Sequence, residues 1–339
     1  MRLGLLGARA DRGGLASQTR EFHRHLSPDR TLVVDLGAAR GPVDLSWYPD
    51  ATVVRGGEVP ADVLDCFLDG LDVLWCAETP YRADAFGRAR QAGVRTVCHA
   101  NPELWKGSRP DLVLAPTSWR LDLLPDPVVL PFPVARDRFP FRRRTQARTF
   151  VHAAAPAMAD RNGTDLVLAA LRHVRVPVRM VVLGRPGKLP SRVGRVAVEQ
   201  GPETADYWRW WPDDGDVLLL PRRYAGQSLP MNEALSLGMP VVSLDVAPQN
   251  EWLPAEALVP VTRRSPRRMA GGVVQVADAD PKALARVMDR LASDPAMVAR
   301  CSDEADRYAE SIAWETLLPR FQALLAGENV ERGLTKSLR

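Results

Sequence analysis

Short, continuous hydrophobic runs recur along the chain, and between them apolar residues return at helical spacing. The first run, RLGLLG, covers Arg2–Gly7. A run that is apolar at nearly every position is typical of a parallel strand buried on both faces. A loop with two adjacent glycines follows at Ala10–Leu15, and a helical pattern runs from Ser17 to Leu26. Further strands are expected to end near Leu36, Ala77, His99 and Ala115, with a helical segment at Arg82–Ala92.

The same alternation resumes in the second half of the chain. Between the halves, Val129–Arg144 contains three prolines and a basic run, which suit neither a helix nor a strand. Strands alternating with helices predict a parallel sheet covered on both faces. The later strands are expected at Phe150–Ala155, Val178–Gly184, Gly194–Gly201, Asp216–Pro221 and Pro240–Asp245, and the helices at Thr164–His173, Leu229–Leu237, Pro281–Ser293 and Ser302–Leu325.

This pattern predicts an α/β protein with two doubly wound domains that face each other across a cleft. The first domain is expected to cover residues 1–135 and to be completed by a C-terminal helix at about 312–327. The second is expected at 146–311, and residues 136–145 form the linker. A length of 339 residues suits two domains of this size.

Composition narrows the class of protein. Hydrophobic residues make up 46% of the chain, and charged residues make up 25%, as in an average soluble protein. The apolar run Leu3–Ala8 is too short for a signal peptide, and no run approaches the roughly 20 apolar residues of a membrane span. The four cysteines show no C-x-x-C spacing. We therefore expect a cytoplasmic enzyme; the net charge of +4 is weak evidence for a nucleic-acid partner.

One segment carries a specific motif. Arg222–Asp245 reads RRYAGQSLPMNEALSLGMPVVSLD. It resembles the donor-binding signature E-G-F-G-L-P-x-x-E-A-x-x-x-G-x-P-V-V of the retaining GT-B glycosyltransferase superfamily (glycosyl transferases group 1, family-4-like). Ala225 stands where that signature has its first glutamate, so the E-x7-E pair is incomplete. The matching positions are Gly226, Leu229, Pro230, Glu233, Ala234, Gly238, Pro240, Val241 and Val242.

The resemblance extends along nearly the whole chain, with further matches in the expected order. Asn162 replaces the lysine of the family's K-G-x-x-x-L helix entry, and Ala157 stands at the position of its arginine. The further matching positions are the glycine loop Gly13–Leu15, the interdomain segment ending at Phe139, Gly163–Leu166, the pair Gly184 and Gly187, Val274–Asp278, and Ala313–Glu315.

The resemblance implies where a nucleotide-sugar donor binds. A carboxylate suits a ribose diol because it accepts two hydrogen bonds, and the family match gives that role to Glu233. The helix start at Ser228 and Leu229 offers unpaired N–H groups to the diphosphate. Gly13 and Gly14 permit close backbone approach from the first domain. Arg161, Arg185 and Lys188 are the candidate substitutes for the missing Arg/Lys pair.

The catalytic candidates are His99, Glu78 and Arg161. His99 ends a strand at the edge where doubly wound sheets bind ligands, and family members often carry a histidine beside the transferred sugar. A capping histidine is the alternative interpretation. Glu78 ends a neighbouring strand and is a candidate for contact with the acceptor, although E-T-P also forms turns. Asp11 is a similar candidate for contact with the acceptor.

Other chemistry-bearing patterns have plainer interpretations. Asp214–Asp216 and Asp278–Asp280 are formally D-x-D motifs, but their positions predict turn and N-cap aspartates, so no metal site is expected. The aromatic segment Tyr207–Trp211 is expected to pack against a sheet rather than stack on a ligand. The arginine runs Arg142–Arg144 and Arg263–Arg268 are expected to be solvated loop charge.

Together these features predict a glycosyltransferase that moves a sugar from a UDP- or GDP-sugar to an unidentified glycan, protein, lipid or DNA acceptor. The resemblance implies retention of anomeric configuration without a metal or other cofactor. Three alternatives remain: a degenerate GT-B protein that binds nucleotide or glycan without transfer, a DNA-modifying glycosyltransferase, and a nucleotide-sugar epimerase of the same fold. The sequence leaves the sugar, base, acceptor and oligomeric state open.

Overall fold

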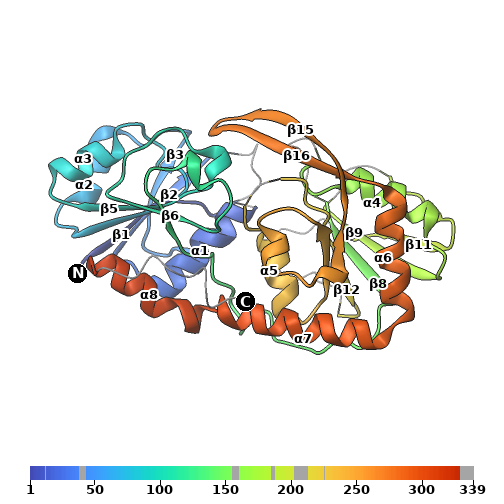
Figure 1. Ribbon diagram of the computed structural model, residues 1–339. Helices are drawn as coiled ribbons and strands as arrows, with labels where there is room; N and C mark the ends of the chain where they lie inside the picture. The colour runs from blue at the N-terminus through green and yellow to red at the C-terminus, as the bar shows by residue number, and fades with distance from the viewer. Residues whose placement is uncertain are drawn as a thin grey trace. The chain divides into compact units, whose positions relative to one another are not determined.

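The structure of the chain is a computed structural model, shown in Figure 1. It describes residues 1–11, 13–37, 43–154, 160–184, 188–201, 213–224 and 226–328. The chain folds into two compact units. The first contains Met1–Phe132, Met269–Gly272 and the terminal helix, and the second contains Pro133–Arg268 and Val273–Ala313.

The first unit is built on a seven-stranded parallel sheet with the order β3-β2-β1-β4-β5-β6-β7. Every described residue of β1 and β4 is buried, as expected for strands covered on both faces. The chain moves outward from β1 to β3 and then returns to place β4 on the other side of β1. The strands are β1 (Leu3–Ala8), β2 (Arg30–Asp35), β3 (Thr52–Arg55), β4 (Val73–Ala77), β5 (Arg95–His99), β6 (Leu112–Ala115) and β7 (Val128–Val129).

The helices of the first unit include one that comes from the far end of the sequence. Helix α8 packs on α1 through a cluster of buried aromatic rings, in which the Phe22 ring centroid lies 5.6 Å from that of Phe321 and 4.7 Å from that of Trp75. This cluster closes one face of the sheet. The helices are α1 (Gly14–Leu26), α2 (Ala61–Leu68), α3 (Ala85–Gln91) and α8 (Trp314–Ala326), with 3-10 turns at Leu45–Trp47, Pro102–Leu104 and Leu121–Leu123.

The second unit repeats the doubly wound plan with the strand order β10-β11-β9-β8-β12-β13-β14. All neighbours in this sheet pair in parallel except β10 and β11. The prediction of two doubly wound parallel sheets is therefore confirmed. The strands are β8 (Thr149–Ala153), β9 (Val178–Leu183), β10 (Arg192–Val193), β11 (Val196–Gln200), β12 (Val217–Leu219), β13 (Val241–Leu244) and β14 (Leu258–Val259).

The helices of the second unit correct one sequence-based expectation. The expected helix at Ser302–Leu325 is two helices, because the helical pattern breaks at Ile312 and Ala313. Ala313 instead forms an isolated bridge with Val134. The helices are α4 (Thr164–Ala170), α5 (Leu229–Ser236), α6 (Pro281–Ser293) and α7 (Pro295–Ser311), with 3-10 turns at Leu171–His173, Gln249–Glu251 and Ala255–Ala257.

The D-x-D aspartates have structural roles in the second unit. Asp280 is the N-cap of α6 and accepts a hydrogen bond from the Lys282 N–H at 2.9 Å. Asp216 accepts from the backbone N–H groups of Arg148 and Thr149 at 2.8 and 2.9 Å, which joins the start of β12 to β8. The role of Asp280 agrees with the N-cap interpretation, whereas Asp216 links two strands rather than forming a turn. The aromatic segment Tyr207–Trp211 lies outside the described residues.

The two arginine runs differ from the solvated loops expected of them. Arg144 is buried, with its Nε 3.0 Å from the Gly215 carbonyl oxygen, and burial lowers its pKa to about 10. Arg143 pairs with Asp303 of α7 at 2.7 Å. The second run forms β15 (Val261–Met269), which pairs with β16 (Gly272–Ala279) in a separate two-stranded sheet. Strand β15 lacks the alternation of apolar and polar residues by which strands are predicted, so backbone pairing with β16 decides its conformation.

Candidate functional site

The topology of the second unit indicates where a ligand binds. Strand order reverses between β8 and β12, because the chain runs from β8 outward to β11 and from β12 outward to β14 in the other direction. In open α/β sheets, ligands bind beyond the carboxyl ends of the strands at such a switch point. The loops that follow β8 and β12 are therefore the candidate site.

The loops that follow β8 and β12 are joined by hydrogen bonds close to the switch point. His152 of β8 donates from Nδ1 to the Leu219 carbonyl oxygen of β12 at 2.8 Å. Its Nε2 lies 2.9 Å from the Thr164 hydroxyl, at the start of α4. The Arg223 N–H donates to the Arg161 carbonyl oxygen at 2.9 Å, which links the two loops directly. These hydrogen bonds hold the backbone of both loops in place.

Gly163 allows the loop after β8 to lie close to the loop after β12. Its φ is +72°, and a Cβ atom there would lie 2.5 Å from the carbonyl oxygen of Pro221 in the opposite loop. Asp160, also at positive φ, accepts hydrogen bonds from the first N–H groups of α4, at Thr164 and Asp165. No side chain larger than hydrogen fits at Gly163 unless the two loops separate.

We expect Gly163→Ala to lower the free energy of unfolding by about 1–3 kcal/mol, because it adds a clash to an unfavourable φ. The matched control is Gly194→Ala in the same unit. Gly194 has a φ of +57°, but the nearest atom to its Cβ would be 3.7 Å away, so only the conformational cost applies. Urea denaturation of both variants gives the comparison, and equal losses would contradict a steric role for Gly163.

Several polar side chains are buried at this end of the sheet. Ser228 is the N-cap of α5, yet its side chain makes no capping hydrogen bond. The residue is 3% exposed, and its hydroxyl has no hydrogen-bond partner among the described residues. Asn162 donates from Nδ2 to the Ala153 carbonyl oxygen at 2.9 Å, while its buried Oδ1 has no described partner. Such atoms are costly unless a ligand or water satisfies them.

The remaining donor-site residues lie around the start of α5. Glu233 is buried on the second turn, and Leu229 is half-buried at the first position of the helix. Arg161 is half-buried in the loop after β8, and Lys188 is exposed in the segment between β9 and β10. Arg185 and Ala225 lie outside the described residues. The structure thus gathers Arg161, Ser228, Leu229 and Glu233 into one unit, on the loops and helix that border the switch point.

Arg222 is a residue that the sequence interpretation missed. It is 5% exposed, directly beyond β12, and its carbonyl oxygen accepts a hydrogen bond from Gln249 Nε2 at 3.0 Å. A buried guanidinium at a switch point is suited to bind an anion. Arg223 beside it donates from Nε to the Ala277 carbonyl oxygen at 3.0 Å. The signal was present in the sequence, because both arginines directly follow the apolar run that ends at Pro221.

The first unit has a second switch point, between β1 and β4. Gly13, the N-cap of α1, has a φ of +135°, and apart from its chain neighbours no atom of a described residue lies within 4 Å of the position its Cβ would take. Gly14 next to it is exposed. Asp11 is buried in an ion pair with Arg9, while its Oδ1 has no described hydrogen-bond partner. Backbone and carboxylate groups thus converge beyond β1.

The loop that follows β4 reaches the same end of the sheet. Glu78 is half-buried with a φ of +70°, and its N–H donates to the His99 carbonyl oxygen at 3.0 Å. Burial raises the pKa of nearby Tyr81 to about 12, and Arg9 opposes that rise. These positions make Glu78 and Asp11 candidates for contact with an acceptor, whereas Tyr81 and Arg9 are neighbours that the sequence did not indicate.

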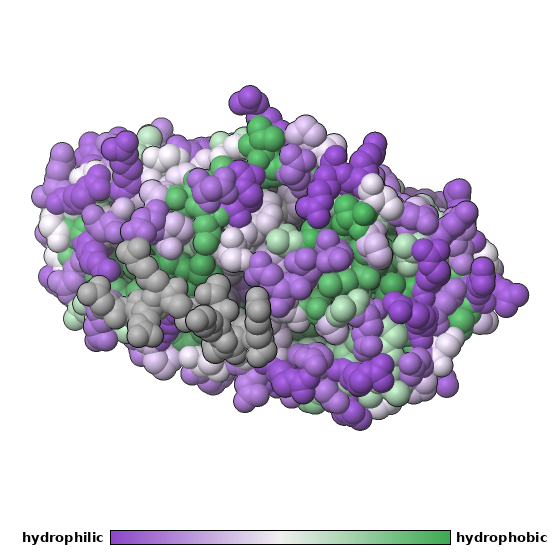
Figure 2. Space-filling view, viewed as in Figure 1, coloured by the Kyte–Doolittle hydropathy of each residue, from purple (hydrophilic) through white to green (hydrophobic). Residues whose placement is uncertain are grey.

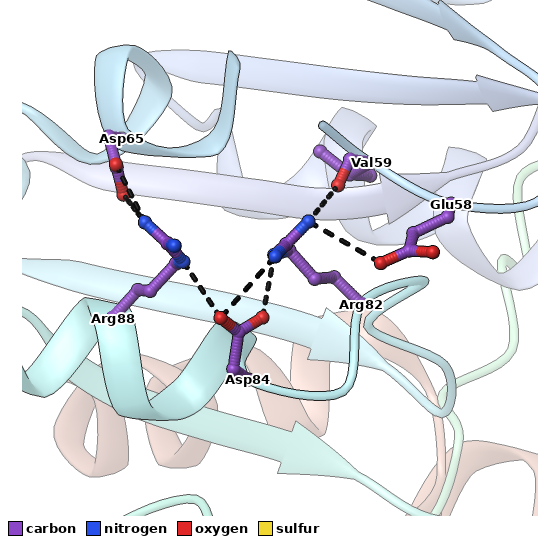
Figure 3. Close-up of polar contacts among 6 residues, drawn as sticks. All are labelled: Glu58, Val59, Asp65, Arg82, Asp84 and Arg88. Carbon is purple, nitrogen blue, oxygen red and sulfur yellow. Dashed lines mark hydrogen bonds and ion pairs between the residues drawn. The ribbon is translucent and has the colours of Figure 1, made fainter. Parts of the chain in front are cut away.

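A network of surface charges ties this loop to the segment that precedes α2, and ties α3 to α2 (Figure 3). Arg82 and Arg88 share Asp84, at 2.6 and 2.9 Å, and the hydrogen bond from Arg88 lowers the pKa of Asp84. The Tyr81 carbonyl oxygen also accepts from the N–H of Val59 at 2.9 Å. Exposed pairs of this kind add little stability, but several together restrict a loop. The other partners in the network are Glu58, Asp65 and the carbonyl oxygen of Val59.

His99 does not have the accessible position expected of a catalytic residue. It is 0% exposed, and its Nε2 donates to the Leu130 carbonyl oxygen at 2.8 Å. Its ring lies 4.2 Å from that of Phe132, inside the aromatic cluster of Phe22, Trp75 and Phe321. The sequence located His99 at a strand end, but its side chain points to the covered face of the sheet. In this structure the residue is part of the buried aromatic core.

The burial of His99 predicts that the free energy of unfolding depends on pH. Burial lowers the pKa of His99 to about 3, whereas a histidine in the unfolded chain titrates near 6.5. Between these values the unfolded chain binds a proton that the folded chain does not. Stability is therefore lost as pH falls, by about 1.4 kcal/mol per pH unit from this residue. Urea denaturation at pH 6 and pH 5 should show a steeper loss for the wild type than for His99→Gln, and identical slopes would contradict the assignment.

Two negative findings concern the described part of the chain. Within it, no three or more histidine, cysteine or acidic side chains are grouped as a metal site requires. Nor does any helix there combine the length and the apolar character needed to cross a bilayer. Figure 2 shows that hydrophilic residues cover most of the described surface on one face, with hydrophobic residues in patches between them.

Comparison with known proteins gives a family match over part of the chain and a fold match over nearly all of it. The model of Glycosyl transferases group 1 matches residues 147–294, and no curated protein sequence matches the chain. HepE from Anabaena, solved with UDP-glucose, is 13% identical with a TM-score of 0.69, and 96% of this chain and 100% of that chain are covered. Sucrose-phosphate synthase from Thermosynechococcus elongatus is 14% identical with a TM-score of 0.67, covering 96% and 98%.

A third similar structure is the apo form of the lipopolysaccharide outer core galactosyltransferase WaaB, at 12% identity and a TM-score of 0.61, with 96% of this chain and 99% of that chain covered. At such low identities these likenesses establish the fold. The matched residues 147–294 contain both loops of the switch point in the second unit and the whole of α5. The chain is therefore a glycosyltransferase of the GT-B fold, and its residues 147–294 belong to the glycosyl transferases group 1 family.

Proposed function

We propose that this glycosyltransferase uses a UDP- or GDP-sugar, whose nucleotide binds at the β8/β12 switch point of the second unit. The observation that carries the proposal is the N-terminus of α5, where the Ser228 hydroxyl is buried without a described hydrogen-bond partner. Helix N-termini attract phosphate through unpaired N–H groups and a positive dipole end. A diphosphate oxygen near Ser228 would satisfy the buried hydroxyl.

The other buried polar groups of this unit suit the rest of the nucleotide. Glu233, one turn further along α5, would accept hydrogen bonds from the two ribose hydroxyls. Arg161 and Arg222 would balance the diphosphate charge in place of the Arg/Lys pair that the superfamily carries. HepE, whose structure matches 96% of this chain, was solved with UDP-glucose. This similarity supports uridine as the base of the donor.

The acceptor and the course of the reaction complete the proposal. The acceptor would bind in the first unit, near Asp11, Gly13 and Glu78 at the β1/β4 switch point. The resemblance to retaining enzymes supports transfer with retention of configuration and without a metal, in which the leaving phosphate helps to deprotonate the acceptor. Arg161 is the candidate for stabilising that leaving group, and the protein would act in the cytoplasm.

The test is thermal stabilisation against a panel of nucleotides and nucleotide sugars, followed by detection of released nucleotide. A ligand present at 100 times its dissociation constant stabilises the fold by about 2.7 kcal/mol. Selective stabilisation by one donor, with release of its nucleotide on incubation with acceptors, is the expected result. A flat response across UDP-, GDP- and other donors would overturn the proposed donor class.

The departures from the superfamily signature favour a second candidate function, that of a GT-B protein that binds a nucleotide without transferring a sugar. Ala225 replaces the first signature glutamate, and Asn162, where a lysine is usual, directs its amide to the Ala153 carbonyl oxygen. Specific stabilisation by a donor combined with no nucleotide release, across glycan, lipid and DNA acceptors, would favour this second candidate.

A further inference from the structure

One arginine of the loop after β12 joins three segments of the second unit. The N–H of Arg223 donates to the carbonyl oxygen of Arg161, in the loop after β8, at 2.9 Å. The carbonyl oxygen of Arg223 accepts from the N–H of Ala277, on β16, at 2.9 Å. Its Nε donates to the carbonyl oxygen of the same Ala277 at 3.0 Å. Arg223 is therefore fixed to β16 through both its main chain and its side chain.

The strand to which Arg223 is bound is itself anchored in the second unit. Strand β16 forms a two-stranded ribbon with β15, and most of β15 is exposed. The other strand differs, because Val274 and Ala277 of β16 are only 0% and 2% exposed. Ala277 and Ala279 belong to the hydrophobic core of the second unit. Closely packed interiors yield little to displacement. Ala277 is thus a fixed point from which Arg223 holds the loop after β12.

The guanidinium of Arg223 also lies between two carboxylates. It is 4.0 Å from Asp160 and 3.5 Å from Asp278, and the side chain of Arg223 is 20% exposed. Asp160 immediately precedes Arg161, and its carboxylate accepts hydrogen bonds from the first N–H groups of α4. Arg223 therefore holds the loop after β8 at two neighbouring residues, through its N–H at Arg161 and through its guanidinium at Asp160.

These contacts distinguish Arg223 from a direct ligand of phosphate. An arginine that binds phosphate offers both its N–H donors and its positive charge to the ligand. In Arg223 the Nε already donates to a main-chain oxygen, and the charge is balanced by Asp160 and Asp278. The residue is therefore suited to place its neighbours rather than to bind a nucleotide itself.

We propose that Arg223 is a positioning residue, which holds Arg161 where it stabilises the leaving diphosphate. This inference rests on the proposed function, in which Arg161 contacts that diphosphate. A cation stabilises a leaving group best when it is in place before the charge develops, and a displacement of about 1 Å can cost about a hundredfold in rate. Arg223 acts through the backbone of the loop after β8, and its own guanidinium does not touch the donor.

The experiment is a double-mutant cycle on the affinity for UDP and GDP, which are the leaving groups of the proposed reaction. Calorimetric titration gives dissociation constants for the wild type, Arg161→Ala, Arg223→Ala and the double variant. We expect each single variant to bind about tenfold more weakly. The double variant should also lose only about tenfold, because Arg223 acts through Arg161. Independent effects would multiply to a loss of about a hundredfold and would overturn the inference.

Arg263→Ala is the matched control, because Arg263 also pairs with Asp278, at 3.2 Å. Among the described residues, Arg263 forms no hydrogen bond or ion pair with either loop of the switch point. Its nucleotide affinity should equal that of the wild type. Arg223→Lys keeps the charge between the two carboxylates and should lose only about threefold. It replaces Arg223→Ala in the cycle if thermal denaturation shows that the alanine variant is not folded.

The outcomes separate this inference from the proposed function. A wild type that binds nucleotide, with unchanged affinity in folded Arg223→Ala, would overturn the inference and leave the proposed function intact. So would an equal loss in Arg223→Ala and in the control. A loss in Arg223→Ala without any loss in Arg161→Ala would also overturn the inference, because Arg223 would then act on another group. A wild type that binds neither UDP nor GDP would overturn the proposed function and the inference with it.

Discussion

Glu233→Gln is expected to weaken binding of the donor nucleotide by about tenfold to a hundredfold, equivalent to about 1.4–2.8 kcal/mol. Glutamine has the same size and shape, but it has no charge and presents one acceptor oxygen where the carboxylate presents two. A ribose diol that donates to both oxygens would lose one strong hydrogen bond and leave a hydroxyl facing an NH2 group. Because Glu233 is buried, water does not readily replace the missing contact.

The measurement is calorimetric titration with UDP and UDP-sugars, or with the donor that the stabilisation panel selects. Glu199→Gln is the matched control, because Glu199 is an exposed glutamate on β11 of the same unit, away from the switch point. Its affinity should equal that of the wild type. Unchanged affinity of Glu233→Gln would remove the ribose role from this residue while leaving the fold and family unaffected.

Phe321→Ala is expected to lower the free energy of unfolding of the first unit by about 3–5 kcal/mol, because it leaves a cavity in a closely packed core. Phe321 is fully buried in α8, and its ring lies 5.6 Å from those of Phe22, Trp75 and Trp314. This loss would be a large fraction of the stability of a typical domain.

Urea denaturation followed by tryptophan fluorescence measures this effect, since Trp75 and Trp314 belong to the same cluster. Gln322→Ala is the control, because Gln322 is exposed on the same helix and alanine is a good helix former. We expect its effect to stay within about 0.5 kcal/mol. A similarly small loss for Phe321→Ala would mean that α8 does not stabilise the first unit.

Much of the fold could be predicted because its strands are buried on both faces. The continuous apolar runs of β1, β4 and β12 can form few other structures, and each is found close to its expected place. Local chemistry likewise predicted the N-cap role of Asp280. The ribbon strand β15 was not predicted, because an exposed strand held only by its backbone pairing leaves no hydrophobic pattern in the sequence.

The sequence by itself determined the class of this protein, because the order of apolar runs and the motif around Glu233 are local properties of the chain. Only the tertiary structure decided what individual side chains face. His99 was correctly placed at a strand end, but α8, more than 200 residues away in sequence, covers its face of the sheet. The position of Arg222 after an apolar run is visible in the sequence, but its burial beside the switch point is decided by the tertiary structure. The burial of a side chain depends on contacts between distant segments, and such contacts are not encoded in any single stretch of sequence.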